Sequence, residues 1–492
     1  MLFTTAQFAL LFLPLALAGF FAIGRWSQQG AAAWLLLASL AFYGYWMPVF
    51  MLLLVASIAA NFVVATRMAR VAGTTAARAL LILGIALNLS LLAYFKYANF
   101  FVDNLDRLLG TNWQFGRVIL PIGISFYSFT QIAFLVDTFR GKVREYRFIQ
   151  YGLFVTYFPH LIAGPVLHHA QMMPQFGNPA IYRFDGANFA GGLAIFAIGL
   201  LKKVVLADGI APYADAVFQP ADQGFSPDLW EAWLGALAYT FQLYFDFSGY
   251  SDMAIGLSRM FNIRLPFNFD SPYRATSISD FWRRWHISLS TFLRDYLYIA
   301  LGGGRHGEAR RYANLMATML LGGLWHGASW SFVLWGGLHG LYLMVNHGFR
   351  TLCGVALSER LDRSRTFLVL GWLLTMTAVV VAWVLFRAET SAGAMRMLRG
   401  MVAAPPTGPS VHPLLWNAGL DAEVGALWCM VLGAVAFLAP NSNRIGARLL
   451  GAANCSALRR GFVGGMATGW VLLLLVLNTA RDSVSAFIYF NF

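Results

Sequence analysis

Long apolar stretches recur along the whole chain of 492 residues, and they restrict its possible folds more than any other feature. The candidate spans are residues 2–24, 31–47, 49–66, 79–95, 117–137, 148–163, 187–206, 230–257, 312–325, 327–346, 366–386, 424–440 and 462–480. About 20 apolar residues are needed for a helix to cross a bilayer. The pattern therefore predicts an all-α, polytopic integral membrane protein with about 11–13 membrane helices.

The composition supports this class and excludes several others. Hydrophobic residues make up 59% of the chain and charged residues only 12%, about half of the quarter that is typical of soluble domains. The mean hydropathy is +0.61. These values exclude a disordered chain, a disulfide-rich secreted domain and an ordinary cytosolic enzyme. The three cysteines have no metal-binding spacing, so neither a disulfide framework nor a metal site is expected.

Some of the candidate spans are too short or too irregular for a full crossing. The segments 148–163, 312–325 and 327–346 contain Gly, Pro or His inside their apolar runs. Irregular backbone is tolerated at membrane depth only where protein or a water-filled cavity covers it. We therefore expect short, tilted or re-entrant segments among the membrane helices.

The net charge is +13, and the basic residues lie mainly in short loops between apolar runs. This placement favours a positive-inside signal over nucleic-acid binding. The basic loops 67–78, 138–148, 259–311 and 444–460 are expected to face the cytoplasm. The loops 96–116 and 164–186 are nearly balanced in charge and are expected to face outward. The topology between residues 207 and 260 stays open, because Lys202 and Lys203 conflict with a simple crossing at 230–257.

Polar residues gather between residues 239 and 347. Asp246, Ser248 and Asp252 lie inside an apolar run. Carboxylates at membrane depth are costly and usually face a cavity or a partner. Each one can serve a functional site, or it can simply pair with an arginine or cap a helix.

The segment that follows is too polar to span and rich in aromatic residues. Ser279 and Asp280 are expected to cap a helix that begins near Phe281. An amphipathic surface helix explains the alternation of aromatic and basic residues. A second interpretation is that arginines of this segment bind the phosphates of a cytosolic donor. The candidate donor-binding residues are Arg283, Arg284 and Arg294.

His326 is the strongest single feature, because it stands in a nearly continuous apolar run beside Trp325. An ionisable residue inside such a run is by default a functional-site hypothesis, and a buried neutral histidine can act as a base. His339 follows 13 residues later, which on one straight helix turns it mostly away from His326. His339 is therefore expected to be a packing residue.

Several blocks, in order, resemble the membrane-bound O-acyltransferase family, and within it the alginate O-acetyltransferase membrane components and related bacterial polysaccharide acetylases. The blocks are LPIGISFYSFTQIAFLVDTFRG (120–141), YFPHLIAGPV (157–166), LKKVVLAD (201–208), YFDFSGYSDMAIGLSRMFNIRLP (244–266), FWRRWHISLSTFLRDYLYI (281–299), LGGGR (301–305), GGLWHGASWSFVLWGGLHG (322–340) and FIYFNF (487–492). The resemblance implies a single domain over residues 1–492 with its core motifs at about 117–347.

The resemblance also implies a catalytic histidine, matched by His326, and a second polar site residue, matched by His286 40 residues upstream. It implies a central tunnel across the membrane, with the acyl donor entering from the cytosol and the acceptor from outside. The polar residues expected near this tunnel are Asp246, Ser248, Asp252, Trp325 and His339. His326 is expected to take the proton of the attacking hydroxyl, while His286 positions groups or stabilises the oxyanion.

The expected activity is transfer of an acetyl group to hydroxyls of an exported polysaccharide such as alginate or cellulose. By resemblance, acetyl-CoA is the donor, no cofactor or metal is bound, and periplasmic proteins help to pass the acetyl group onward. The expected location is the bacterial inner membrane, with membrane lipids as further partners. Two alternatives remain open: D-alanyl transfer to teichoic acid from a carrier-protein thioester, and transport of a polysaccharide or lipid-linked sugar.

Overall fold

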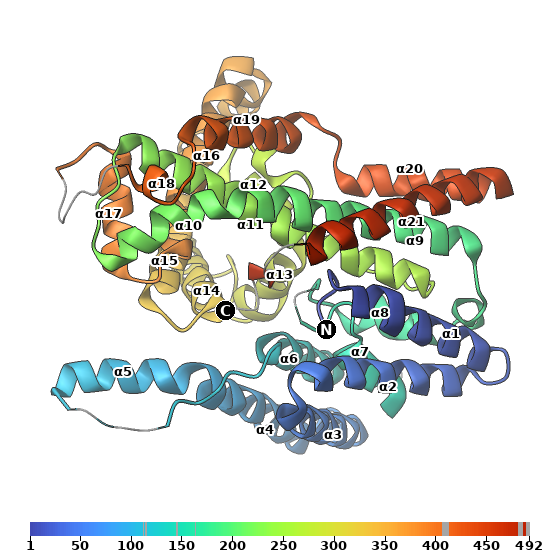
Figure 1. The fold of residues 1–492 in the computed structure, drawn as a ribbon. Helices are drawn as coiled ribbons and strands as arrows, with labels where there is room; N and C mark the ends of the chain where they lie inside the picture. The colour runs from blue at the N-terminus through green and yellow to red at the C-terminus, as the bar shows by residue number, and fades with distance from the viewer. Residues whose placement is uncertain are drawn as a thin grey trace. The chain divides into compact units, whose positions relative to one another are not determined.

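A computed structural model describes residues 1–111, 113, 116–143, 146–162, 164–405, 413–480 and 486–488, and all regular structure in these ranges is helical (Figure 1). Within these ranges, six helices are long and apolar enough to cross a membrane: Gln7–Gly24, Pro48–Arg70, Thr75–Leu109, Gly186–Gln223, Arg365–Arg387 and Ala457–Thr479. The bent pair Ala422–Leu438 and Ser442–Cys455 can supply a seventh. The prediction of an all-α, polytopic membrane protein is confirmed.

Within the described residues, length and hydropathy support six or seven spans, against the 11–13 expected. Six candidates have no counterpart among these spans: 31–47, 117–137, 148–163, 230–257, 312–325 and 327–346. Three of the six are the irregular segments. The candidate 148–163 contains α7 (Phe148–Thr156), whose nine residues are too few for a crossing. The candidates 312–325 and 327–346 belong to α14 (Glu308–His326) and α15 (Trp330–Arg363), which also carry charged residues. These segments were expected to be short, tilted or re-entrant.

The contacts divide the chain into two compact units. Unit 1 comprises Met1–Leu201, Tyr250–Phe267 and Ser442–Asn491, and unit 2 comprises Lys202–Gly249 and Asn268–Asn441. The long helix α11 (Leu229–Met260) contributes to both. Because each unit is built from separate stretches of chain, neither corresponds to one continuous segment. The single domain over residues 1–492 stays a prediction.

Unit 1 is a set of packed helices connected by short loops. Its elements are η1 (Gln7–Phe12), α1 (Leu13–Gly24), α2 (Gln28–Trp46), α3 (Pro48–Arg70), α4 (Thr75–Leu92), η2 (Ala93–Tyr97), α5 (Ala98–Leu109), α6 (Ile124–Phe139), α7, α8 (His169–Phe176), η3 (Pro179–Tyr182), α9 (Gly186–Leu201), the end of α11, α20 (Ser442–Cys455) and α21 (Ala457–Thr479). Side chains of Ser27 and Thr74 accept hydrogen bonds from the first turns of α2 and α4 and so define where these helices begin. Helices α9, α20 and α21 pack together (Figure 1).

One contact in unit 1 corrects the expected loop orientation. The Gln175 side chain donates to the carbonyl of Arg264 at 2.9 Å and accepts from its backbone N–H at 2.8 Å. The loop 164–186 therefore lies on the same side as the end of α11, although it was expected outside and 259–311 inside. The two assignments cannot both hold, and the charges of the loop 164–186 are a weak signal because they are only Arg183 and Asp185.

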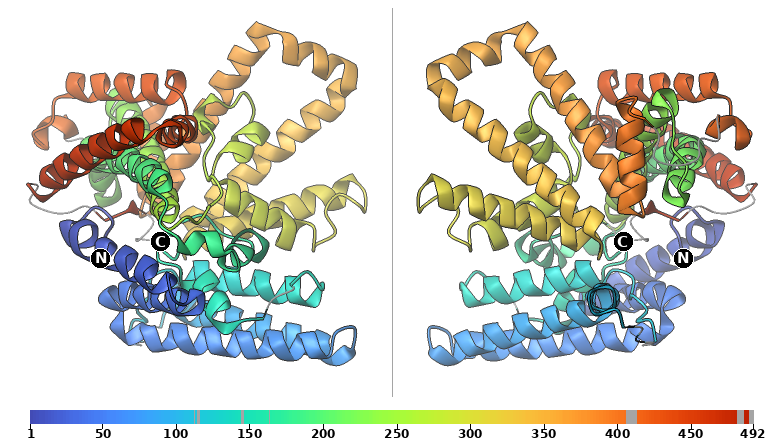
Figure 2. Two further views of the ribbon diagram at one scale, coloured as in Figure 1. Left: turned by 90° about the vertical axis from the view of Figure 1, so that its right-hand side faces the viewer. Right: turned by 90° about the vertical axis from the view of Figure 1, so that its left-hand side faces the viewer.

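Unit 2 contains α10 and most of α11 together with the long helices α14, α15 and α16. Its elements are η4 (Lys202–Ala207), α10 (Asp208–Gln223), α11 up to Gly249, η5 (Pro272–Arg274), α12 (Ile278–Arg284), α13 (Ile287–Phe292), η6 (Leu293–Tyr298), α14, α15, α16 (Arg365–Arg387), α17 (Ser391–Met401), α18 (Leu414–Asn417) and α19 (Ala422–Leu438). Figure 2 shows α15 and α16 as long neighbouring helices. Gly354, with φ of 66°, interrupts the regular backbone of α15 before the chain turns back.

Glycines let α14 and α15 cross at very short range. A Cβ atom on Gly323 would lie 2.2 Å from the Phe332 carbonyl oxygen, and one on Gly336 would lie 2.3 Å from that of Met319. No larger residue fits at either position without moving the backbone. The close crossing brings the start of α15 against the end of α14, where His326 lies.

Candidate functional site

Two segments of unit 2 run side by side and bring Asn268 to His286. The backbone N–H of Asp270 donates to the Arg284 carbonyl, and that of Ile287 donates to the Asn268 carbonyl, both at 3.0 Å. His286 precedes the first turn of α13 with φ of 43°, in the left-handed region that a residue with a Cβ atom rarely adopts. Strained backbone of this kind is often kept at functional sites.

The hydrogen bonds around Asn268 determine which ring nitrogen of His286 carries the proton. Asn268 Oδ1 accepts from the Ser288 backbone N–H at 3.2 Å and from its hydroxyl at 2.8 Å. His286 Nδ1 lies 3.2 Å from the same oxygen. Because a backbone N–H can only donate, the shared atom is an acceptor, and Nδ1 must be the protonated nitrogen. Neutral His286 therefore carries its lone pair on Nε2.

His286 is fully buried, and burial lowers its pKa to about 3. Desolvation penalises the charged imidazolium, so the ring is neutral throughout the physiological pH range. Phe247 of α11 contacts the ring edge-on with a centroid distance of 4.8 Å. Aromatic surroundings of this kind keep water away from the histidine.

His326 is the last residue of α14 and is also buried. Its ring centroid lies 6.5 Å from that of His286. Trp325, at 4.9 Å from His326 and 6.2 Å from His286, joins the two. The structure thus brings together the two histidines and the tryptophan that the sequence singled out. We call His286, His326, Trp325 and Trp335 the histidine cluster.

Trp335 of α15 completes this cluster. Its ring lies 5.1 Å from His326 at an interplanar angle of 88°. The side chain is buried, and among the described residues its indole N–H has no hydrogen-bonding partner. An indole nitrogen can only donate, so this N–H can serve an acceptor that reaches it.

His339 lies about one helical turn after Trp335 on α15, and it packs among aromatic rings rather than beside His326. Its ring is 4.9 Å from Trp335, 5.2 Å from Trp282 and 6.1 Å from Phe281. Neither ring nitrogen has a hydrogen-bonding partner in the described part of the chain. The surroundings are those of a packing residue.

The buried carboxylates behave differently from one another. Asp246 pairs with Lys203 at 2.7 Å, and Lys203 also reaches Asp208 at 2.7 Å. Ser248 accepts a hydrogen bond from Lys202 at 3.4 Å. Asp246 therefore forms an ion pair, as one of the two interpretations expected, but its partner is a lysine and not an arginine. Asp252 belongs to unit 1, where it lines a small cavity.

The three candidate donor-binding arginines are not equivalent. Arg284 binds Asp280 at 2.9 Å, and Arg294 binds Asp295 at 2.7 Å. Arg283 is exposed and has no carboxylate partner among the described residues. The helix α12 that carries it begins at Ile278 and is capped by Ser277, not by the expected Ser279 and Asp280.

Arg283 lies near a second arginine. The Ser279 hydroxyl donates to Asn346 of α15 at 2.7 Å, and Arg283 follows Ser279 by one helical turn on the same face. On α15 the next residue is His347, whose Nδ1 accepts from Arg311 of α14 at 2.6 Å. Burial, then the charges of Arg311 and Arg283, lower the pKa of His347. Two guanidinium groups thus flank a neutral histidine.

Sequence reasoning missed Asn268, Trp335 and Lys203. Asn268 is a lone amide in the aromatic run PFNFD, and this contrast was the available signal. Nothing in the sequence pairs Lys203 with Asp246, because the two are 43 residues apart on different helices. Among the described residues, no group of three or more His, Cys, Asp or Glu side chains is arranged to hold a metal ion.

Comparisons with known proteins agree with this geometry. The model of the membrane-bound O-acyltransferase family matches residues 87–386, which include the whole histidine cluster. A peptidoglycan O-acetyltransferase of Helicobacter pylori is 43% identical over 429 residues, covering 82% of this chain and 80% of the relative. A probable alginate O-acetylase of Pseudomonas aeruginosa is 44% identical over 407 residues, covering 82% and 75%. A teichoic acid D-alanyltransferase of Streptococcus thermophilus is 26% identical over 283 residues, covering 54% and 68%.

Proposed function

This chain belongs to the membrane-bound O-acyltransferase family, and from that premise we propose that it acetylates hydroxyl groups of an exported polysaccharide. As a member of the family it is an O-acyltransferase. The relatives above 40% identity carry names of enzymes that acetylate alginate or peptidoglycan, which favours a glycan acceptor. The observation that carries the proposal is the pair of buried histidines, 6.5 Å apart, in one compact unit.

His326 acts as the general base. Its imidazole takes the proton from the attacking hydroxyl as the oxygen forms a bond to the thioester carbonyl carbon. The carbon–sulfur bond then breaks, and the departing sulfur takes this proton back from the imidazolium. The products are an O-acetyl ester and a free thiol, and the base returns to its neutral form.

His286 positions a hydroxyl rather than stabilising an oxyanion. Its Nδ1 proton is held by Asn268, so the Nε2 atom is a hydrogen-bond acceptor. Protonation of Nε2 would be needed before it could donate to an oxyanion, and the low pKa of His286 disfavours this. The acceptor Nε2 suits a substrate hydroxyl that must be oriented before its proton moves to His326.

Trp335 supplies the donor that an oxyanion needs. Its indole N–H is buried beside His326 and has no partner within the described residues. A donor held in place in a site that excludes water strengthens its interaction with the developing negative charge. We assign to Trp335 a hydrogen bond to the thioester oxygen in the transition state.

The donor is a cytosolic thioester, most simply acetyl-CoA, bound through its phosphates by Arg283 and Arg311. Arg283 has no carboxylate partner among the described residues, whereas Arg284 and Arg294 are ion-paired. Arg311 lies 15 residues before His326 on α14, about 22 Å along a helix. A flexible acyl-carrying arm suits this separation between phosphate and reactive carbonyl.

The remaining parts of the proposal concern location and partners. The enzyme resides in the bacterial inner membrane, takes the acetyl group from the cytosol and delivers it outside. Delivery to the glycan is direct or passes through a periplasmic protein. The names of the relatives support polysaccharide acetylation, and membrane lipids surround the spans.

The deciding experiment measures ester-linked acetate on the secreted polysaccharide of a deletion strain. Complementation with wild type is expected to restore acetate, and His326→Ala is expected to leave none at matched membrane levels. His306→Ala, which changes an exposed loop histidine, is the control and should restore acetate fully. Full acetylation by His326→Ala would overturn the catalytic assignment.

D-alanyl transfer is the second candidate because the teichoic acid enzyme is also similar, although at 26% identity over about half of this chain. It would use a carrier-protein thioester instead of acetyl-CoA. Consumption of acetyl-CoA by the purified enzyme, dependent on His326, separates the two. Family membership favours either transferase over a sugar transporter.

A further inference from the structure

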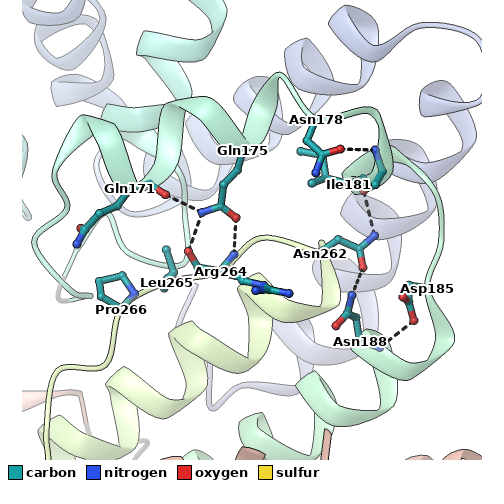
Figure 3. Close-up of a pocket in the computed structure, with 11 residues that line it drawn as sticks. Gln171, Gln175, Asn178, Ile181, Asp185, Asn188, Asn262, Arg264, Leu265 and Pro266 are labelled. Atoms are coloured by element: carbon teal, nitrogen blue, oxygen red, sulfur yellow. Dashed lines mark hydrogen bonds between the residues drawn. The ribbon is translucent and has the colours of Figure 1, made fainter. Parts of the chain in front are cut away.

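Unit 1 contains a polar pocket of about 770 Å³ that the acyl-transfer chemistry does not use (Figure 3). It is formed by α8, η3, the start of α9 and the residues that follow α11. Five amide side chains line it, from Gln171, Gln175, Asn178, Asn188 and Asn262. Such a concentration of amides is unusual in a protein that is 59% hydrophobic.

Some of these amides hold the walls together. Gln175 bonds both backbone groups of Arg264. Asn262 donates to the carbonyls of Ile181 and Arg183 at 3.0 and 2.8 Å, and it accepts from Asn188 at 3.0 Å. The pocket is therefore shaped before any ligand arrives, which lowers the entropic cost of binding.

Other polar atoms of the pocket have no hydrogen-bonding partner among the described residues. These atoms determine which groups of a ligand the pocket can bind. The donors are the Gln171 and Asn178 amide groups and the Arg264 guanidinium, which Figure 3 shows extending toward Asn262 and Asn188. The acceptors are one Asp185 oxygen and the Asn188 amide oxygen, since Asp185 uses its other oxygen on the backbone of Ala187 and Asn188. Figure 3 shows the Gln171 amide at the opposite end of the pocket from the Arg264 guanidinium, so these polar groups are spread along the pocket.

The positive charge is reinforced and has no carboxylate partner. Within the described part of the chain, Arg264 forms no ion pair, and its hydrogen bonds use only its backbone. Arg259 is nearby, and burial followed by the charge of Arg264 lowers the pKa of Arg259. The Arg264 guanidinium favours an anionic group of a ligand, and the Asp185 carboxylate in the same pocket favours a hydroxyl that donates a hydrogen bond.

The pocket opens at the basic end of unit 1. Gly24, at the end of α1 beside Arg25, packs against Tyr182, and a Cβ atom there would lie 2.8 Å from the Tyr182 carbonyl. Gly186 packs against Arg460 in the first turn of α21. Arginines thus gather around the pocket, and the excess of arginine places this end at the cytoplasmic surface.

We propose that this pocket binds a phosphate group carried by a hydroxylated headgroup at the cytoplasmic surface of the membrane. Arginine matches the geometry of phosphate, and the two amide groups add neutral donors. The hydroxyls of the headgroup bind Asp185 and Asn188. Two sources share this chemistry: the phosphoglycerol headgroup of phosphatidylglycerol, and the phosphorylated ribose of a soluble nucleotide such as coenzyme A. The proposal does not rest on acetyl transfer.

The test uses the purified full chain in phosphatidylcholine nanodiscs. One arm counts phosphatidylglycerol molecules retained by the protein in native mass spectrometry after mixing the two lipids. The other arm measures coenzyme A binding by calorimetry. Each is repeated with Arg264→Gln, with Gln171→Glu and with the control Arg183→Gln. Gln171→Glu keeps the oxygen that accepts from the His168 backbone N–H but places a negative charge in the pocket. Arg183 is exposed in the same loop but does not line the pocket.

Arg264→Gln and Gln171→Glu are expected to weaken binding about tenfold or more in one arm, because each removes or opposes a charge-assisted contact. Arg183→Gln is expected to change it less than twofold. If the variants lose phosphatidylglycerol binding, the ligand of the pocket is the lipid headgroup. If they lose coenzyme A binding, the ligand is the nucleotide. The proposal is overturned if neither probe loses affinity, or if Arg183→Gln weakens binding as much as Arg264→Gln. Normal acetylation by a variant that has lost binding would leave the proposed function intact.

Discussion

The histidine cluster of unit 2 and the polar pocket of unit 1, called the amide pocket below, place their polar side chains in opposite surroundings. In the histidine cluster, His286 Nδ1 lies 3.2 Å from Asn268 Oδ1, and aromatic rings pack against the imidazole. In the amide pocket, polar groups bond one another and the backbone in a network open to solvent. The first excludes water and the second does not.

The difference teaches where a single substitution should matter. A buried polar group that loses its partner cannot turn to water, so it incurs the full desolvation cost. A group at the surface exchanges a protein partner for water at little net cost. Substitutions in the interior of unit 2 should therefore have large effects, and those in the walls of the amide pocket should have small ones.

The largest effect on stability is expected for Lys203→Met. Lys203 is buried and lies between Asp246 and Asp208, each at 2.7 Å. Removing it leaves two carboxylates without their cation, and breaking a buried ion pair costs about 3–5 kcal/mol. Asp246→Asn should cost clearly less, because Lys203 keeps Asp208. Thermal unfolding in detergent measures both, and equal losses would show that the lysine is not the centre of this cluster.

The next effect concerns activity. Trp335→Phe keeps an aromatic ring beside His326 but removes the indole N–H that we assign to the oxyanion. Removing one such donor typically lowers kcat about 100- to 1000-fold. Trp282→Phe, whose ring lies 5.8 Å from Trp335 and 5.2 Å from His339, is the matched control and should lower kcat little. If Trp335→Phe raises KM and leaves kcat unchanged, Trp335 has a packing role instead.

A third prediction concerns pH. The pKa of His286 is about 3 in the folded chain and about 6.5 in an unfolded one. The unfolded state binds more protons between these values, so the stability that His286 contributes is complete above about pH 6.5 and declines as the pH falls. Between pH 7.5 and 5 the loss is about 2 kcal/mol. His286→Gln, which cannot titrate, should lose less stability over this interval. Parallel melting curves for the two proteins would contradict the assignment.

The sequence predicted those features that depend on local patterns. The apolar runs located most helices, and the motif around His326 and Trp325 identified the cluster that the fold assembles. It could not predict that Asn268 holds His286 or that Lys203 neutralises Asp246, because these pairs join segments distant in the chain. Local charge balance also separated the loop 164–186 from the end of α11, whereas the bonds between Gln175 and Arg264 hold the two together.

The smallest effect is expected for Gln175→Ala in the amide pocket. This substitution removes two hydrogen bonds to the Arg264 backbone and one to the Gln171 carbonyl, all exposed. Water replaces the lost partners, so the free energy of unfolding should fall by only about 1 kcal/mol. Measured beside Lys203→Met under the same conditions, it tests whether burial decides the cost of losing a polar partner. A loss as large as that of Lys203→Met would mean that the network around Arg264 is as essential to unit 1 as the buried ion pairs are to unit 2.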